Sequence, residues 1–238
     1  MNKVVVLQSN YIPWKGYFDL IHDADVFIFY DDVQYTKNDW RNRNRIKRSN
    51  GVDWLTIPSG TNLNRKICEV TLNDSDWAIR HWTLIRDSYS KAPHFNKYKD
   101  FFEHVYLGTK WRSLSELNQF LIKNISSLFL GITTVFKDSR EYSAAGQKLD
   151  RLIDLVTQAK ADVYISGPSA KNYIDEIRFR KAGVAVKFKS YSGYPEYPQF
   201  YPPFEHAVSI LDLLFQVGPD TPYFIWGWRQ DNPDPSVA

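Results

Sequence analysis

The chain has 238 residues, of which 43% are hydrophobic, 24% charged and 16% aromatic, and its formal net charge is +3. This composition is typical of a globular protein that buries a core without disulfides or metals, and the small net charge gives no general basicity that would favour nucleic acid. The single cysteine, Cys68, excludes a disulfide framework and a cysteine-based zinc site. Without a signal peptide or an apolar run of membrane-span length, the expected location is the cytoplasm, with no membrane partner.

The first predicted elements are two buried strands joined by a helix. Continuous apolar residues at 4–7 and 26–30 are typical of buried strands, and apolar residues at helical spacing predict a helix over 15–24. A strand, a helix and a second strand in this order imply parallel strands with a right-handed crossover. Ligands of such sheets bind beyond the carboxyl ends of the strands. Polar residues 8–10 and 31–34 follow these two strands, so two polar loops are expected at one edge of the sheet.

The rest of the chain alternates between strand and helix patterns around a long helical stretch. Short apolar runs predict strands at 54–58, 67–72, 133–136, 163–165 and 184–188. Helical spacing and capping residues predict helices at 76–89, 95–104, 113–130, 147–160, 172–181 and 209–217. Residues 191–203 are expected to form an ordered, irregular loop, and 230–238 a frayed tail. The predicted fold is a single α/β domain over residues 1–230, followed by a tail at 231–238. It would have a mostly parallel Rossmann-like sheet flanked by helices, with a helical insertion at about 76–130.

The segment from Lys37 to Arg48 carries six cations and one acid in twelve residues. Because side chains alternate along an extended strand, one face would carry four cations, Arg41, Arg43, Arg45 and Lys47. The opposite face would carry Asn42, Asn44 and Ile46. Parallel cations repel one another unless an anion lies among them, and arginine forks bind phosphates and carboxylates bidentately. The alternative is a solvated basic edge strand, but the interleaved asparagines favour a ligand, so we interpret residues 30–47 as an anion-binding wall.

Two acids and one histidine are candidates for proton transfer. Asp31 and Asp32 directly follow a buried strand, so one of them could act as a general base or hold an amine or a metal, and turn capping is the alternative. His81 is a titratable group on a predicted helix, although a lone histidine is more often structural. No histidine and acid fall at metal-ligand spacing, so no metal site is predicted.

A second possible anion site lies where the strand at 163–165 turns into a helix. Ser166 and Gly167 begin this turn, whose backbone N–H groups would point at an anion, and Lys171 could add a charge. The glycine and lysine spacing of a Walker loop is missing. Ser169 as an ordinary helix cap is an equally simple interpretation.

Several motifs occur together along the chain. They are Gln8-x2-Tyr11-x-Pro13-Trp14-x-Gly16-Tyr17-Phe18, Asp31-Asp32-Val33-Gln34-Tyr35, Trp40-Arg41-Asn42-Arg43-Asn44-Arg45-Ile46, Trp54-Leu55-Thr56-Ile57-Pro58, Lys91-Ala92-Pro93-His94-Phe95, Tyr164-Ile165-Ser166-Gly167 and Ser209-Ile210-Leu211-Asp212-Leu213-Leu214-Phe215. In this combination the chain resembles the WbqC-like family, to about Gly218. Leu7 departs from the family pattern, which often has a histidine before the glutamine, so any role of that histidine is absent here or dispensable.

The resemblance implies a role in making bacterial surface polysaccharides. Family members occur in gene clusters for O-antigen and related polysaccharides, often beside enzymes of amino-sugar synthesis. We therefore expect N-acyl or aminoacyl transfer to a nucleotide-linked deoxyamino sugar, with acyl-CoA or an acyl carrier protein as co-substrate and no bound cofactor. Asp31 or His81 would take a proton from the sugar amine. The other expected contacts with substrate are Gln8, Tyr11, Trp14, Asp32, Gln34, Trp40, Arg41, Asn42, Arg43, Arg45, Ser166, Gly167 and Lys171.

Two other functions compete with this expectation. Residues 13–21 also show a weaker likeness to nucleotidylyltransferases and pantothenate synthetase-like ligases, which suggests an ATP-dependent ligase, but the paired histidines of those enzymes are missing here. The basic segment could instead belong to a non-catalytic module that binds nucleic acid or a partner protein. The net charge of +3 and the family setting count against this third function.

Overall fold

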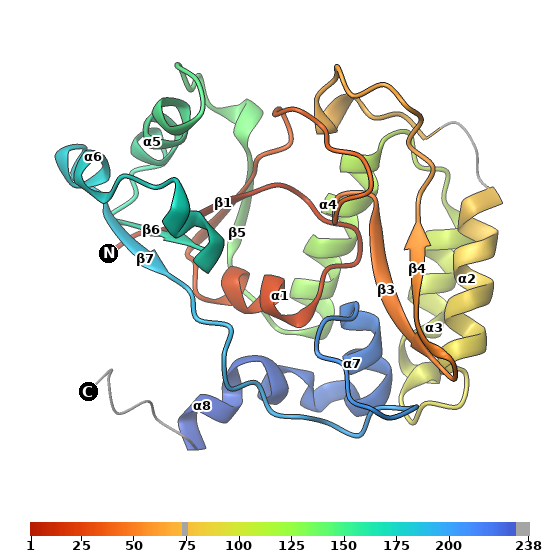
Figure 1. Cartoon of the computed structure of the whole chain (residues 1–238). Coiled ribbons are helices and arrows are strands. Elements are labelled where there is room, and N and C mark those ends of the chain that lie inside the picture. Colours follow the sequence, from red (N-terminus) through yellow and green to blue (C-terminus); the bar gives the residue numbers. More distant parts are fainter. Residues whose placement is uncertain (73–75, 232–238) are drawn as a thin grey trace.

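The computed structural model describes residues 1–72 and 76–231, and at its centre lies a five-stranded sheet (Figure 1). The strands are β1 (Lys3–Leu7), β2 (Val26–Phe29), β5 (Val135–Asp138), β6 (Val163–Ser166) and β7 (Ala185–Phe188). Their order is β5-β2-β1-β6-β7, and each neighbouring pair is parallel. In chain order this is a 3-2-1-4-5 arrangement, so the predicted Rossmann-like fold is confirmed. The order reverses between β1 and β6, which makes their carboxyl ends the switch point of the sheet.

Helices cover both faces of the sheet because side chains alternate along each strand. On one face Val4, Val6 and Ile28 are buried together with residues of two helices, α5 (Leu149–Gln158) and α6 (Glu176–Lys181). On the other face Val5, Phe27 and Phe29 join a larger core. That core includes residues of α1 (Lys15–His22), α4 (Leu114–Asn124) and α7 (Ile210–Val217). Each fully buried phenylalanine contributes about 1.5–3 kcal/mol to this packing.

A separate antiparallel hairpin lies beside the sheet. It consists of β3 (Arg43–Arg48) and β4 (Gly51–Thr56), and Figure 1 shows it between the sheet and α2 (Asp76–Tyr89). Ile46 and Leu55 are fully buried in the larger core. The helices α2, α3 (Phe95–Glu103) and α4 fall within the predicted helical insertion, and α8 (Trp228–Asp231) ends the described chain. None of the helices in residues 1–72 and 76–231 has the length and apolar character to cross a membrane.

The predicted strand at 67–72 is wrong. Residues Ile67–Glu69 form one 3-10 turn, and two of their backbone N–H groups bond to the loop after β2. The N–H of Ile67 donates to the carbonyl of Val33 at 3.0 Å, and that of Cys68 donates to the carbonyl of Asp31 at 2.9 Å. The burial of Ile67 and Val70, three residues apart, fits this turn instead of a strand.

Several predicted boundaries also move. The helix expected at 172–181 begins at Glu176, because the Asp175 carboxylate accepts hydrogen bonds from the N–H groups of Ile177 and Arg178 and so caps it there. Pro168–Asn172 instead forms a 3-10 turn. Of the predicted tail, 230 and 231 belong to α8, and the remainder lies outside the described residues.

Candidate functional site

Two adjoining cavities open at the switch point of the sheet. Cavity A has a volume of about 490 Å³ and cavity B about 960 Å³. Both are lined by the same four residues at the ends of β1 and β6 and just beyond, which we call the shared wall: Leu7, Gln8, Ser166 and Tyr173. Parallel sheets of this topology bind their ligands at this position.

Buried side chains from other elements fix the loop between β1 and α1, residues 8–14. The Asp31 carboxylate accepts a hydrogen bond from the N–H of Ser9 at 2.8 Å. From β3, the Asn44 amide donates to the carbonyls of Tyr11 and Ile12 at 3.0 and 2.9 Å. These contacts hold Ile12 at a φ of 35°, a left-handed conformation that a β-branched residue rarely adopts. The hairpin therefore shapes the floor of cavity A without its own cations facing the cavity.

Besides Tyr173 of the shared wall, four aromatic side chains line cavity A: Trp14, Tyr17, Trp40 and Tyr191. The rings of Trp14 and Tyr191 meet edge to face, with centroids 5.2 Å apart. A Cβ atom on Gly16 would lie 2.3 Å from the Trp14 ring, so glycine is required there. The indole therefore lies against the first turn of α1. Such flat rings bind the apolar faces of sugars, acyl groups and nucleobases.

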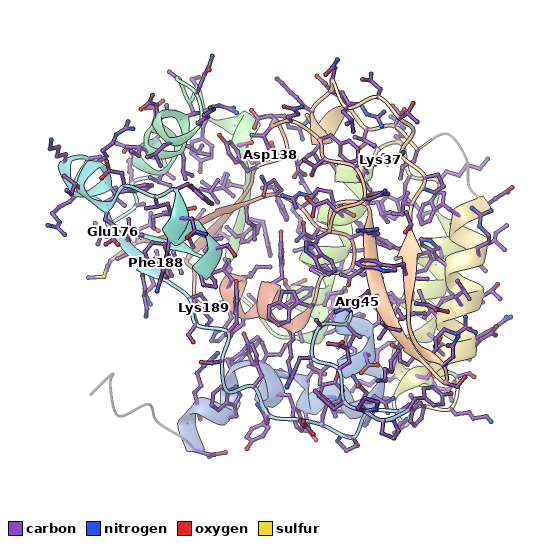
Figure 2. The ribbon with its side chains drawn as sticks, viewed as in Figure 1. Lys37, Arg45, Asp138, Glu176, Phe188 and Lys189 are labelled. Carbon is purple, nitrogen blue, oxygen red and sulfur yellow. The ribbon has the colours of Figure 1, made fainter. Side chains whose placement is uncertain are left out.

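An ion-pair network holds this aromatic wall from behind. Asp19 on α1 is fully buried. Its carboxylate accepts hydrogen bonds from Lys189 at 2.7 Å, from the Tyr194 hydroxyl at 2.5 Å and from Arg229 at 2.6 Å. Figure 2 labels Lys189 beside α1, where the chain leaves β7. The ring of Tyr194 packs edge to face on Trp14. The network therefore fixes the wall of cavity A and also joins α1 to the segments that carry Lys189 and Arg229.

Two polar atoms in the wall of cavity A are buried without a hydrogen-bond partner among the described residues. They are Oδ1 of Asn10, an acceptor, and Nε of Arg41, a donor. The Nη1 atom of Arg41 is already paired with the Asp39 carboxylate at 2.8 Å. A buried polar group without a partner costs about 1–3 kcal/mol. A ligand that offers both a donor and an acceptor would remove this cost once the two side chains turn these atoms towards the cavity.

Cavity B has a more charged wall. Its charged side chains are Asp32, Lys66, Lys148 and Arg151. Asp32 forms an ion pair with Arg151 and accepts a hydrogen bond from the Ser139 hydroxyl at 2.6 Å. Burial raises the pKa of Asp32, but the bonds from Arg151 and Ser139 outweigh it and hold that pKa below its ordinary value. Across residues 1–72 and 76–231, no three His, Cys, Asp or Glu side chains are grouped so that they could hold a metal ion.

Asp31, a predicted proton acceptor, does not line either cavity. Its side chain is fully buried, and its carboxylate accepts hydrogen bonds from the N–H of Ser9, from the Ser115 hydroxyl and, at 3.1 Å, from the Gln119 amide. These donors come from the loop after β1 and from α4. The geometry of Asp31 is that of an anchor for the loop, because a substrate in either cavity does not reach its carboxylate.

His81, the other predicted proton-transfer group, is also outside the cavities. Its Nδ1 atom accepts a hydrogen bond from the Tyr11 hydroxyl at 2.8 Å, and its Nε2 atom donates to the carbonyl of Thr56 at 3.2 Å. Burial lowers its pKa to about 4. The Tyr11 hydroxyl also meets that of Tyr106 at 2.6 Å. This neutral histidine therefore joins α2 to β4 and to the loop after β1.

The cavities bring together about half of the predicted site residues. Those that line cavity A are Gln8, Trp14, Trp40, Arg41, Ser166 and Gly167, and those that line cavity B are Gln8, Asp32, Gln34 and Ser166. Besides Asp31 and His81, the predicted residues that line neither cavity are Tyr11, Asn42, Arg43, Arg45 and Lys171.

The cations of the basic segment do not share one ligand-binding face. Arg43 lies over the ring of Trp54, 4.1 Å from its centroid, and Nε of Arg45 donates to the carbonyl of Ala207 at 3.0 Å. Figure 2 labels Arg45 on β3. The Lys47 ammonium donates to the carbonyl of Pro203. Arg41 precedes β3 and turns into cavity A, so it is the one arginine of the predicted clamp that lines either cavity.

Other predicted contacts have structural partners. The Asn42 amide donates to the carbonyl of Ile57 at 2.9 Å, which holds the hairpin, and Lys171 lies over the ring of Phe188.

Several residues that line the cavities were not predicted, including Asn10, Tyr17, Tyr191, Lys66, Lys148 and Arg151. Asn10 lies in the polar loop that the sequence did single out, and Tyr191 begins the tyrosine-rich loop. Lys148 follows Gly146 at the start of a predicted helix, which is a weak signal for an anion site. Nothing in the sequence marks Lys66 or Arg151, because their position depends on tertiary packing.

Fold and site together define an α/β protein with a Rossmann-like sheet and two adjoining cavities at its switch point. Residues 8–223 match the model of the WbqC-like protein family, and the chain belongs to this family. It is also 47% identical, over 232 residues, to the uncharacterized protein Rv1507c of Mycobacterium tuberculosis, covering 97% of this chain and 100% of that protein. No solved structure matches the chain significantly.

Proposed function

We propose that this protein is a transferase that acylates or aminoacylates the amine of a nucleotide-linked deoxyamino sugar used for bacterial surface polysaccharides. The observation that carries the proposal is the pair of cavities with a shared wall at Leu7, Gln8, Ser166 and Tyr173. A transfer reaction needs two bound substrates whose reacting groups meet. Two cavities that open on the same four residues meet this requirement, whereas a simple binding module needs one.

The chemical character of cavity A supports this assignment. Its aromatic rings suit a sugar ring or an acyl chain, and the unpartnered atoms of Asn10 and Arg41 suit a ligand with hydroxyl or amide groups. In the reaction the neutral sugar amine attacks the carbonyl carbon of the donor. The new C–N bond forms, the bond between the carbonyl carbon and the donor's leaving group breaks, and the proton lost by the amine passes to the leaving thiolate, which departs as free thiol. The resemblance to proteins of O-antigen clusters is consistent with such a substrate.

The proposal is tested by product formation with the purified protein. We would incubate it with a dTDP- or UDP-linked amino sugar and acyl-CoA thioesters, without ATP, and follow the mass of the nucleotide sugar. The expected result is an acylated sugar and free thiol in equal amounts. Formation of the product only with ATP, with release of AMP or ADP, would overturn acyl transfer and establish the ligase. If no sugar is modified and the protein instead shows salt-sensitive binding to DNA or RNA, the enzyme proposal fails.

Two asparagine variants separate ligand binding from folding. Asn10→Ala removes a buried acceptor that has no partner, so the variant should keep its melting temperature but lose at least tenfold in kcat/KM. Asn118 is fully buried, and its amide donates to the carbonyl of Arg41 at 2.8 Å. Asn118→Ala should therefore cost about 1–3 kcal/mol of stability. A loss of stability in Asn10→Ala with unchanged kinetics would contradict the role of Asn10 in binding.

A further inference from the structure

The proposed function does not say where the phosphates of the nucleotide-linked sugar bind. The charged side chains of the two cavities differ, and this difference indicates the position. In cavity A, Arg41 is paired with Asp39, so its wall is close to neutral. In cavity B, Asp32 pairs with Arg151, but Lys66 and Lys148 form no ion pair with any residue in the described part of the chain. The wall of cavity B therefore carries two uncompensated positive charges. Two such charges on one concave surface attract an anion.

The usual phosphate position of this fold is less suited to a phosphate here. In many Rossmann-like proteins the pyrophosphate rests on the N-terminus of the first helix, next to a glycine-rich loop. Here the loop at 8–14 has no glycine, and the indole of Trp14 lies against the first turn of α1. The ring of Trp14 fills the space beside Gly16, and the N–H of Tyr17 already donates to the carbonyl of Trp14 at 3.0 Å. This turn therefore offers a phosphate less room and fewer free donors than a glycine-rich loop does.

Cavity B offers another position at the start of α5. Its wall includes Gly146, Gln147, Lys148 and Leu149, which lead into α5. No side chain caps this helix, because Lys148 at the N-cap position makes no side-chain cap hydrogen bond. Asp150, in the first turn, pairs its carboxylate with Arg178 and donates its N–H to the carbonyl of Gln147 at 3.1 Å. The N–H groups of Leu149 and Arg151 have no side-chain cap beside the two lysines. These N–H groups add to the attraction of the lysines for an anion.

The rest of cavity B fits a nucleoside better than a phosphate alone. Its volume of about 960 Å³ far exceeds that of one phosphate group. Tyr30 and Tyr173 supply aromatic surface for a base. Asp32 accepts one bond from Ser139 and one from Arg151, which leaves lone pairs on its carboxylate oxygens for ribose hydroxyl groups.

We propose that cavity B binds the nucleoside diphosphate of the sugar substrate, with its phosphates held by Lys66, Lys148 and the first turn of α5. The sugar then extends across the shared wall, and its amine meets the acyl donor in cavity A. This inference rests on the proposed function for the identity of the sugar, but the binding of a nucleoside diphosphate can be tested separately from transfer.

The test is isothermal titration of the full chain with UDP, dTDP, the matching nucleosides and inorganic pyrophosphate. We expect both nucleoside diphosphates to bind more tightly than pyrophosphate, and the nucleosides to bind at least tenfold more weakly than their diphosphates. The charge-reversal variants Lys66→Glu and Lys148→Glu should each weaken diphosphate binding at least tenfold. Lys97→Glu, on the exposed side of α3, is the matched control and should stay within twofold of the parent.

A further variant, in cavity A, tests whether the diphosphate binds in cavity B. Trp14→Ala alters cavity A, so it should leave UDP binding within about threefold while it weakens binding of the acyl-CoA. Diphosphate binding that is unchanged in both lysine variants, or that falls as much in Trp14→Ala, would overturn the inference. So would the absence of any diphosphate binding. If UDP binds in cavity B as described but no sugar is acylated, the inference stands and the proposed transferase fails.

Discussion

The buried imidazole of His81 predicts a specific loss of stability in acid. Its pKa is lowered to about 4 by burial, whereas an unfolded histidine titrates near 6.5. Between these two pH values the unfolded chain binds one more proton at this residue than the folded chain does. The free energy of unfolding therefore rises with pH in this window. The stabilising contribution is complete above pH 6.5 and is lost as the pH falls towards 4.

The size of this effect follows from the difference between the two pKa values. At about 1.4 kcal/mol for each pH unit, the interval from 6.5 to about 4 corresponds to about 3 kcal/mol. His81→Gln provides the comparison, because the glutamine amide can still accept from the Tyr11 hydroxyl and donate to the Thr56 carbonyl. Urea unfolding at several values between pH 4 and pH 7 measures both proteins. Carboxylates and other histidines titrate equally in the two, so their effects cancel in the difference.

Parallel stability profiles for the parent and His81→Gln would refute this reasoning, because they would mean that His81 titrates normally in the folded protein. An NMR resonance assigned to His81 that titrates near pH 6.5 would do the same. The kinetics give an independent check on the acid–base role first suggested by the sequence. If His81→Gln abolished turnover without changing stability, the imidazole would have to reach the substrate in a conformation different from the one described.

Two lysines carry the remaining predictions. Burial lowers the pKa of Lys15 from 10.5 to about 8, so between these pH values the unfolded chain holds one more proton and the free energy of unfolding should rise with pH. Lys15→Met should abolish this rise and should increase the free energy of unfolding by as much as about 3 kcal/mol at pH 7. Urea unfolding measures both effects. If the difference in the free energy of unfolding between the parent and Lys15→Met were the same at pH 7 and pH 10, the lowered pKa of Lys15 would be contradicted. Lys189 bonds to Asp19 and Asp23 at 2.7 Å each, so Lys189→Met should cost about 3 kcal/mol in thermal unfolding, while the exposed Lys181→Met should stay within about 0.5 kcal/mol. Equal effects of the two substitutions would contradict the buried network.

The sheet was predictable because its strands are continuous apolar runs flanked by polar loops. The runs that became β1 and β2, with a helix between them, already imply parallel pairing and a site at the carboxyl ends. The error at 67–72 arose because a short apolar run can be buried in a turn as well as in a strand. Here the loop after β2 supplies the hydrogen-bond partners, and such long-range partners are invisible in the local pattern.

The lining of the candidate site could be predicted where it coincides with strand ends, but not where it depends on which side chains pair with one another. Gln8 directly follows β1, Asp32 lies three residues beyond β2, and Ser166 is the last residue of β6, so the order of elements located them. Arg43 and Arg45 line neither cavity, because the hairpin register places Trp54 opposite Arg45 and the guanidinium of Arg43 packs on the ring of Trp54. The alternation of side chains along a strand shows which of them share a face, but the residues of the partner strand determine what those side chains contact.

In the loop at 8–14, contacts to the backbone fix the path of the chain, while side chains of the loop line cavity A. This division affects how the cavity can change in evolution. Asp31 and Asn44 hold main-chain atoms of the loop, so its path does not depend on the side chains that project into cavity A. Substitutions at Asn10, or at Tyr191 from another segment, can then change the shape of the cavity while the loop stays in place. Related proteins could in this way accept different ligands on one scaffold. Selection for a new substrate would act on the cavity lining, and selection for folding on the residues beneath it.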